Sequence, residues 1–237
     1  PRAAAQPDLR AVGRTAGVVT MQGKQFVVGE GVIGAGKTTL AEFLGTAWNA
    51  RLLLEDFGRN PYLEEFYRDR PRYAFQTQIT FLLARYQEQQ DLLQRDIFSP
   101  RIVSDYLFQK DRIFANLNLS DQELALYEQV AALLEREIPP PDMVVYLQAS
   151  PDVIWSRIQQ RGRSYERAMD PKYTATLAEA YNYFFFHYKD APLLIVNTNE
   201  LNFVDRRADL EGLVARMEVH QEGVAYVTPG AETGGAP

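Results

Sequence analysis

The sequence contains no cysteine and only two histidines, His187 and His220, among its 237 residues. The lack of cysteine excludes disulfide bonds, thiolate catalysis and cysteine-ligated zinc or iron–sulfur sites. Two histidines cannot supply a multi-histidine metal site and leave little material for a Ser–His–Asp triad. The formal net charge of −6 argues against broad binding to nucleic acid or to anionic membranes. No apolar run approaches the length that a bilayer-spanning helix needs.

We expect one folded domain over residues 22–227, with an extension at each end. Residues 1–21 are rich in Ala, Arg, Gly and Pro without clear periodicity, and residues 228–237 read TPGAETGGAP. Such sequences bury too little apolar surface to fold, so we expect both ends to be disordered. For the first extension, the alternatives are a transit peptide or a segment upstream of a natural start at Met21.

Short apolar segments alternate with helical patterns along the predicted domain. Five segments are expected to be strands, and they cover residues 25–28, 51–55, 101–105, 143–148 and 193–196. Helices are expected at 38–48, 73–95, 120–134 and 152–161, and around the aromatic cluster 181–186, which we interpret as core or interface. The alternation predicts an α/β fold, with a five-stranded parallel sheet flanked by helices on both faces.

Four of the fifteen glycines fall between residues 29 and 36, directly before a lysine and two threonines. Residues 31–38 (GVIGAGKT) fit the pattern G-x-x-x-x-G-K-[ST] between a predicted strand and a predicted helix. Glycines let backbone N–H groups converge on phosphate oxygens, while Lys37 reaches the β and γ phosphates and Thr38 can ligate Mg²⁺. A plain glycine-rich turn is the alternative. The pattern predicts a nucleoside triphosphate binder. The expected ATP site consists of Gly31, Val32, Ile33, Gly34, Ala35, Gly36, Lys37, Thr38, Thr39 and Arg157.

A cationic cluster, WSRIQQRGR, ends the fourth predicted helix. Arg157 and Arg161 are four residues apart and share a helix face, while Gly162 lets Arg163 turn inward. Three guanidinium groups could close over a transferred phosphoryl group and stabilise its developing charge. We therefore predict a lid over about residues 161–170; a solvated basic face is the alternative.

The chain resembles the deoxyribonucleoside kinases of the P-loop superfamily, especially the bacterial deoxyguanosine and deoxyadenosine kinase type. The resemblance covers about residues 26–196. It rests on EGVIGAGKTTL, on Glu55 followed by NPYLEEFYRDRPRYAFQTQ, on SDYLFQKDRIFA and on VVYLQASPDVIWSRIQQRGRSYE. It implies a fold like that of the P-loop nucleoside and nucleotide kinases, a homodimer packed through long helices, and transfer of the ATP γ-phosphoryl group to the 5′-hydroxyl of a deoxyribonucleoside.

The resemblance also implies roles for residues around the sugar. Glu55 would hydrogen-bond the 5′-hydroxyl and act as general base, with a surface acid at a strand end as the alternative. Tyr67 and Glu166 would hold the 3′-hydroxyl. Independently of the resemblance, two carboxylates at the acceptor site would repel a nucleoside monophosphate, whereas sugar hydroxyls are natural donors to carboxylates.

For the base, the resemblance implies that the Gln76 amide pairs with its edge and that Phe114 stacks on it. Phe75, next to Gln76, is also expected in the substrate site. Taken singly, Phe75, Phe114 and Tyr67 would each be interpreted as core residues. A glutamine amide offers one donor and one acceptor, so selectivity must come from the neighbours Leu83, Arg85, Lys110 and Asp111. The bacterial purine-type likeness favours deoxyguanosine or deoxyadenosine.

Two positions depart from the family pattern. Val32 stands where relatives usually have Asn, which removes one polar contact from the phosphate loop. The third strand ends in Ser104-Asp105-Tyr106 rather than in an acid, an arginine and a serine. We assign Asp105 to Mg²⁺ together with Thr38, with a structural acid as the alternative. Arg163 or Arg112 would then replace the missing arginine.

The sequence therefore predicts a cytoplasmic Mg²⁺-ATP-dependent deoxynucleoside kinase of nucleotide salvage, with neither nucleic acid nor membrane as a partner. The catalytic residues would be Glu55, Lys37, Arg157, Arg161 and Arg163. One alternative is a nucleoside monophosphate kinase. The other is a non-catalytic accessory protein of the same fold, as found in the respiratory chain, against which the intact Gly36-Lys37-Thr38 sequence and Glu55 argue.

Overall fold

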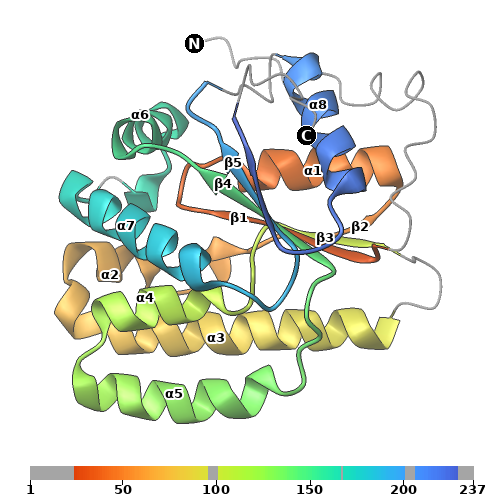
Figure 1. The fold of residues 1–237 in the computed structure, drawn as a ribbon. Helices are drawn as coiled ribbons and strands as arrows, with labels where there is room; N and C mark the ends of the chain where they lie inside the picture. Colours follow the sequence, from red (N-terminus) through yellow and green to blue (C-terminus); the bar gives the residue numbers. More distant parts are fainter. Residues whose placement is uncertain (1–23, 96–100, 167, 201–205, 229–237) are drawn as a thin grey trace.

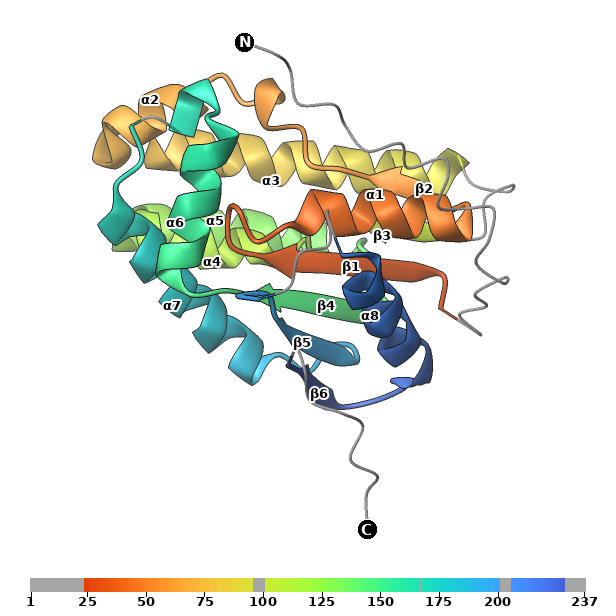
Figure 2. The same ribbon diagram turned by 90° about the horizontal axis from the view of Figure 1, so that it is seen from above.

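The computed structural model describes residues 24–95, 101–166, 168–200 and 206–228. Apart from Thr228, the two predicted disordered extensions lie outside the described residues. The described chain forms one parallel sheet with helices on both faces, which confirms the predicted α/β fold (Figures 1 and 2).

The sheet has six strands in the described residues, one more than predicted. Their order is β2-β3-β1-β4-β5-β6, and every neighbouring pair is parallel. The strands are β1 (Phe26–Gly31), β2 (Arg51–Leu53), β3 (Ile102–Ser104), β4 (Met143–Gln148), β5 (Leu193–Asn197) and β6 (Val224–Val227). The prediction missed β6 because it is a four-residue edge strand in which only Val227 is buried. Its sequence pattern is therefore too short to stand out from a loop.

Eight α-helices connect and cover these strands in the described residues. They are α1 (Lys37–Trp48), α2 (Leu63–Arg68), α3 (Arg70–Arg95), α4 (Lys110–Asn118), α5 (Asp121–Glu135), α6 (Pro151–Arg161), α7 (Pro171–His187) and α8 (Arg207–Val219). The capping box predicted before α5 is present: Glu123 accepts the Ser120 backbone N–H at 2.9 Å. The prolines that begin α6 and α7 occupy a position where a missing N–H costs no helical bond.

The core consists of two layers, one on each face of the sheet. Alternate side chains of β4 point to opposite faces, as the pleat requires. Val144 and Tyr146 pack in a layer with α7, whereas Val145 and Leu147 pack in a layer with α1 and α8. In Figure 1, α1 and α8 lie on one side of the sheet and α3, α4 and α5 lie on the other. A third cluster joins α3, α4 and α5 to one another.

The strand order places the candidate site. From β1 the chain continues to β2 and β3 on one side of β1, and then to β4 on the other. Ligands of open α/β sheets bind where the order reverses, at the carboxyl ends of the strands. Residues 31–36 follow β1 there, Glu55 lies two residues beyond β2, and Asp105 directly follows β3.

Candidate active site

The phosphate loop has the backbone shape that its glycines were expected to give. Gly36, which caps the N-terminus of α1, has φ 102°, a value that L side chains rarely adopt. At Gly31, an added Cβ would lie 2.5 Å from the Leu147 carbonyl oxygen of β4. The Lys37 ammonium donates to the carbonyl oxygens of Gly31 at 2.7 Å and Val32 at 3.2 Å, folding over the loop. The loop and the helix N-terminus together form an anion-binding cradle.

A cleft of about 870 Å³ opens over this cradle. Its walls include eight of the ten residues predicted to contact ATP, which are Ile33, Gly34, Ala35, Gly36, Lys37, Thr38, Thr39 and Arg157. Gly31 and Val32 are buried and do not line the cleft. Val32 is 2% exposed and packs in the core. The Asn-to-Val difference at position 32 thus places an apolar side chain where the core can bury it.

The three predicted arginines all face this cleft. Arg157 donates to the Thr198 carbonyl oxygen at 2.6 Å and to its hydroxyl at 3.2 Å. Arg161 forms an ion pair with Glu166. Arg163 donates to the Tyr165 hydroxyl at 2.6 Å, so the three guanidinium groups have different anchors. Gly162, with φ 63°, caps the C-terminus of α6 in the left-handed conformation, and the lid over about residues 161–170 stays a prediction.

Thr38 and Asp105 meet at the floor of the cleft, where the Thr38 hydroxyl donates to Asp105 Oδ2 at 2.5 Å. The other oxygen, Asp105 Oδ1, accepts the Glu55 backbone N–H at 2.8 Å. A hydroxyl and a carboxylate oxygen beside a phosphate cradle fit Mg²⁺, which binds few protein oxygens and takes its remaining ligands from phosphates and water. No cluster of three or more His, Cys, Asp or Glu side chains that could hold a metal occurs in the described residues.

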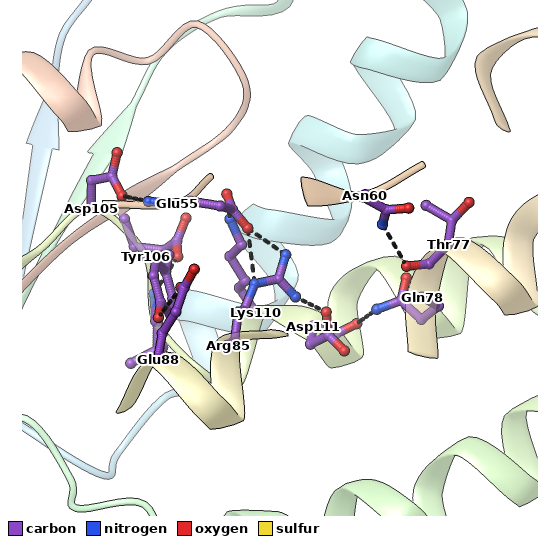
Figure 3. A network of polar contacts seen from close by, with 12 residues as sticks. Glu55, Asn60, Thr77, Gln78, Arg85, Glu88, Asp105, Tyr106, Lys110 and Asp111 are labelled. Carbon is purple, nitrogen blue, oxygen red and sulfur yellow. Dashed lines mark hydrogen bonds and ion pairs between the residues drawn. The ribbon is translucent and has the colours of Figure 1, made fainter. Parts of the chain in front are cut away.

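Glu55 is the centre of a buried ion-pair network (Figure 3). Its side chain is 3% exposed, and it accepts hydrogen bonds from Arg85 Nε at 2.9 Å and from Lys110 Nζ at 2.5 Å. Arg85 also forms an ion pair with Asp111, whose other oxygen accepts the Tyr127 hydroxyl at 3.0 Å. The four groups therefore balance two positive charges against two negative ones.

This network sets the charge of Glu55. Burial alone would raise the pKa of the carboxyl, but the adjacent Lys110 and Arg85 outweigh burial and lower the pKa of Glu55 to about 2. Glu55 is therefore ionised at neutral pH, and its oxygens can only accept hydrogen bonds.

A small cavity lies beside Glu55, and its walls include part of the predicted nucleoside site. Glu55, Tyr67 and Phe114 line it together with residues of α3 and α7. Its volume of about 40 Å³ is well below the roughly 300 Å³ of small ligand pockets. A nucleoside therefore enters only if side chains move. Phe57 borders both this cavity and the larger cleft, so its movement would join the two.

Phe75 and Gln76 are not brought to this cavity, and the residue that reaches it is Gln78. Gln76 is exposed on α3, whereas Gln78 is 5% exposed and donates to the Asp111 carbonyl oxygen at 2.8 Å. A shift of two residues turns a side chain by about 200° around a helix axis. The structure therefore does not place the Gln76 side chain at this cavity, whereas Gln78 on the same helix lines it.

Tyr67 and Glu166 come together between the cleft and the cavity, as the resemblance implied. Both line the larger cleft, and Tyr67 also lines the smaller cavity. Burial, together with nearby Tyr173 and Glu166, raises the pKa of Tyr67, so its hydroxyl remains a hydrogen-bond donor. Glu166 is 3% exposed and is held by Arg161, which couples the lid to the predicted sugar site.

Lys110 occupies the place for which Arg163 or Arg112 was expected. Arg112 points elsewhere and pairs with Glu135 at 2.7 Å and Glu128 at 3.4 Å on α5. Arg163 contacts Tyr165, while Lys110 reaches Glu55 directly. No local spacing singles out Lys110: it is the first residue of α4, and its contact with Glu55 depends on how the turn after β3 enters that helix.

A phosphate loop at the switch point, an acid beside its threonine, and an arginine-bearing lid define a P-loop kinase. The chain also matches the family model described as deoxynucleoside kinase over residues 27–221. It is 31% identical to deoxyguanosine kinase of Bacillus subtilis (strain 168), covering 81% of this chain and 96% of that protein. It is 33% identical to deoxyadenosine kinase of Dictyostelium discoideum, covering 78% and 76%.

Among solved structures, deoxyadenosine kinase from M. mycoides with bound dATP superposes with a TM-score of 0.70 at 27% identity. The match covers 81% of this chain and 99% of that chain. The chain belongs to the deoxynucleoside kinase family and is an ATP-dependent phosphotransferase. Within the described residues, no helix combines the length and the apolar character needed to cross a membrane.

Proposed function

We propose that this enzyme transfers the γ-phosphoryl group of ATP to the 5′-hydroxyl of a purine deoxyribonucleoside, in the cytoplasmic salvage of nucleotides. The observation that carries the proposal is the placement of Glu55. Its buried carboxylate lines a small cavity together with Lys37 of the phosphate loop, Tyr67 and Phe114. A hydroxyl held by Glu55 would face the donor phosphates that Lys37 binds.

The charges of the cavity favour an uncharged acceptor. Two of its three cations, Arg85 and Lys110, already pair with Glu55 and Asp111, and the third, Lys37, donates to carbonyl oxygens of the phosphate loop. A nucleoside monophosphate would need arginines free to neutralise its phosphate. At the mouth of the cavity, Arg161 pairs with Glu166. The pairing supports a nucleoside kinase over a nucleoside monophosphate kinase.

Glu55 would act mainly by orienting the hydroxyl. A carboxylate with a pKa of about 2 is a weak base toward an alcohol in its ground state. The hydroxyl becomes acidic as its oxygen bonds to phosphorus, so Glu55 would take the proton late in a loose transition state. Lys37, Arg157, Arg161 and Arg163 would stabilise the charge on the transferred group.

Thr38 and Asp105 would hold Mg²⁺, directly or through water. A metal held by these two residues would supply positive charge that neutralises part of the charge on the donor phosphates. The hydrogen bond between the Thr38 hydroxyl and Asp105 supports this assignment, because it brings the two oxygen ligands side by side.

For base selection we propose that Gln78 replaces Gln76 as the amide at the base edge. Gln78, Arg85 and Asp111 border the same cavity and are joined to one another by hydrogen bonds. Phe114 lines that cavity from α4, where a base could stack on it. Preference for deoxyguanosine or deoxyadenosine is supported by the names of the relatives, which are kinases of those nucleosides.

A homodimer is proposed through the outer face of α7. Tyr183 and Phe186 on this helix are 72% and 77% exposed. Tyr183 borders an open cleft of about 610 Å³ between α7 and α4, whose walls include Ile113 and Leu117. Large exposed aromatic side chains beside a concave surface are typical of an interface. Light scattering should show a dimer that Tyr183→Lys converts to monomer, whereas Leu133→Lys on the outer face of α5 should not.

The test of the proposed activity is a radiolabelled ATP transfer panel over the four deoxynucleosides and their monophosphates. Purine deoxynucleosides should be converted to monophosphates, with no labelling of the monophosphates offered. Labelling of dGMP or dTMP in preference to deoxynucleosides would establish the monophosphate kinase instead. Failure to label any acceptor would favour the non-catalytic accessory protein.

A further inference from the structure

Glu30, near the end of β1, carries a buried carboxylate that the proposed chemistry does not use. The residue is 0% exposed. Its Oε1 accepts the Gly31 backbone N–H at 2.8 Å and lies 3.4 Å from the Tyr181 hydroxyl, which donates to it. Its Oε2 accepts the Leu107 backbone N–H at 2.7 Å. A buried charge is costly to desolvate, so a carboxylate here is expected to have a role beyond filling space.

The three partners of Glu30 belong to three different parts of the site. Gly31 begins the phosphate loop. Leu107 lies in the turn between Asp105 at the end of β3 and Lys110 at the start of α4. Tyr181 comes from α7 and lines the cavity beside Glu55. The Glu30 carboxylate therefore contacts the phosphate loop, the turn between Asp105 and Lys110, and a side chain that lines the cavity beside Glu55.

The charges around Glu30 match this arrangement. Burial raises the pKa of Glu30, and the cations Lys110 and Lys37, which contact Glu55 and the phosphate loop, act against that rise. No other carboxylate within the described chain bonds the backbone of both the phosphate loop and the turn after β3. Loss of either hydrogen bond would free one loop to shift against the other without removing any group that touches substrate.

We propose that Glu30 is a positioning residue that fixes the turn bearing Asp105 and Lys110 against the phosphate loop. It thereby aligns Lys110 and Glu55 with the donor phosphates. The inference rests on the proposed kinase function. It concerns alignment in the transition state, and so it predicts a change in kcat rather than in the binding of either substrate.

The test is Glu30→Gln, which keeps the shape of the side chain. An amide has one oxygen, so one of the two backbone N–H groups would face an NH₂ donor instead of an acceptor. We expect kcat to fall about ten-fold or more, with KM for ATP and for the nucleoside changed less than about three-fold. Direct binding of ATP, measured by calorimetry, should be close to that of the wild type.

Asp142→Ala is the matched control. Asp142 Oδ2 accepts the backbone N–H groups of Gln25 at 2.7 Å and Phe26 at 2.8 Å, at the opposite end of β1. The substitution removes two hydrogen bonds to the backbone that lie far from the site. The melting temperature should therefore fall, while kcat stays within about two-fold of the wild type. An equal loss of kcat in Asp142→Ala would show that Glu30 has a general structural role, and the proposal would fail.

Glu30→Asp covers the case in which Glu30→Gln does not fold. It retains the charge but is one methylene too short to bond both loops, so kcat should fall while KM is maintained. Wild-type kcat in either folded variant, a loss expressed in KM alone, or failure of both variants to fold would each overturn the proposal. An inactive wild-type enzyme would instead contradict the proposed function, which keeps the two failures distinct.

Discussion

Lys110 and Arg112 lie two positions apart on α4, but only Lys110 reaches Glu55. Lys110→Met should therefore lower kcat about ten-fold or more, because one oxygen of a buried carboxylate loses its donor. Removal of that cation should also raise the pKa of Glu55 from about 2 toward its ordinary value. Steady-state kinetics on Lys110→Met and on the control Arg112→Met measure the effect. Equal kcat values for the two variants would refute the role of Lys110.

Gln78 and Gln76 provide a second paired test on one helix. Gln78→Ala should raise KM for the preferred purine deoxynucleoside about ten-fold or more, since a buried amide that bonds the base edge is lost. Gln76→Ala removes only an exposed side chain and should leave KM within about two-fold. If Gln76→Ala has the larger effect, the amide that reads the base is at position 76 after all.

Single-residue placements could be predicted from the sequence only where a motif defines the spacing. The phosphate-loop pattern places Lys37 and Thr38 to the residue, and the structure puts both in the cleft. The FQTQ segment contains two glutamines on one helix, and pattern alone does not show which one faces the cavity. The contact between Lys110 and Glu55 depends on how the turn after β3 enters α4, and no local spacing encodes this tertiary feature.

The phosphate loop is an element whose shape depends on what packs behind it. Gly31→Ala would place a methyl group 2.5 Å from the Leu147 carbonyl oxygen, so β1 and β4 would have to separate. We expect weaker ATP binding and a loss of about 1–3 kcal/mol in the free energy of unfolding. Calorimetry and urea unfolding measure the two effects.

Gly212→Ala in α8 serves as the control for that variant. A Cβ there meets nothing within 4 Å, and alanine has a higher helix propensity than glycine. Its free energy of unfolding should rise by about 0.5–1 kcal/mol, and its ATP affinity should be unchanged. If Gly31→Ala unfolds like the wild type and binds ATP normally, the proposed packing against Leu147 is wrong.

Elements marked by strong local patterns were predictable, and those that depend on their neighbours were not. The capping box defines the start of α5 to the residue. The helix predicted from residue 73, α3, begins at Arg70 instead, because its first turn follows directly on α2 through Asp69 and shows no apolar stripe. The edge strand β6 is defined by its pairing with β5.

The whole molecule buries an unusual set of phenols. Burial raises the pKa of Tyr173 to about 12 and raises the pKa of six further tyrosines. Those six are Tyr67, Tyr106, Tyr127, Tyr146, Tyr181 and Tyr188. Each pKa in the folded state lies above its unfolded value of 10, so the folded state retains protons that the unfolded state loses above that pH.

Stability should therefore be complete below pH 10 and decrease as the pH rises above it. Each such tyrosine contributes a slope of about 1.4 kcal/mol per pH unit in that range. Urea unfolding between pH 8 and pH 11 measures the slope, and phenolate absorbance should appear together with unfolding. Phenolate signal from most of these tyrosines while the protein is still folded would show that their burial is incomplete.

At the scale of the molecule, the doubly covered parallel sheet and the location of the site were predictable. Alternating strand and helix patterns specify the layers, and the phosphate loop identifies the switch point. The small size of the cavity beside Glu55 was not predictable, because residues of α3, α4 and α7 line it and their packing sets its volume.

The central claim is that the Glu55 carboxylate orients and deprotonates a sugar hydroxyl beside the donor phosphates. Rapid-quench measurement of a single turnover in Glu55→Gln, together with its ATP dissociation constant, tests it most directly. We predict that phosphoryl transfer slows by about 10²–10⁴-fold while ATP affinity stays within about three-fold of the wild type. Transfer at the wild-type rate in this variant would contradict the account.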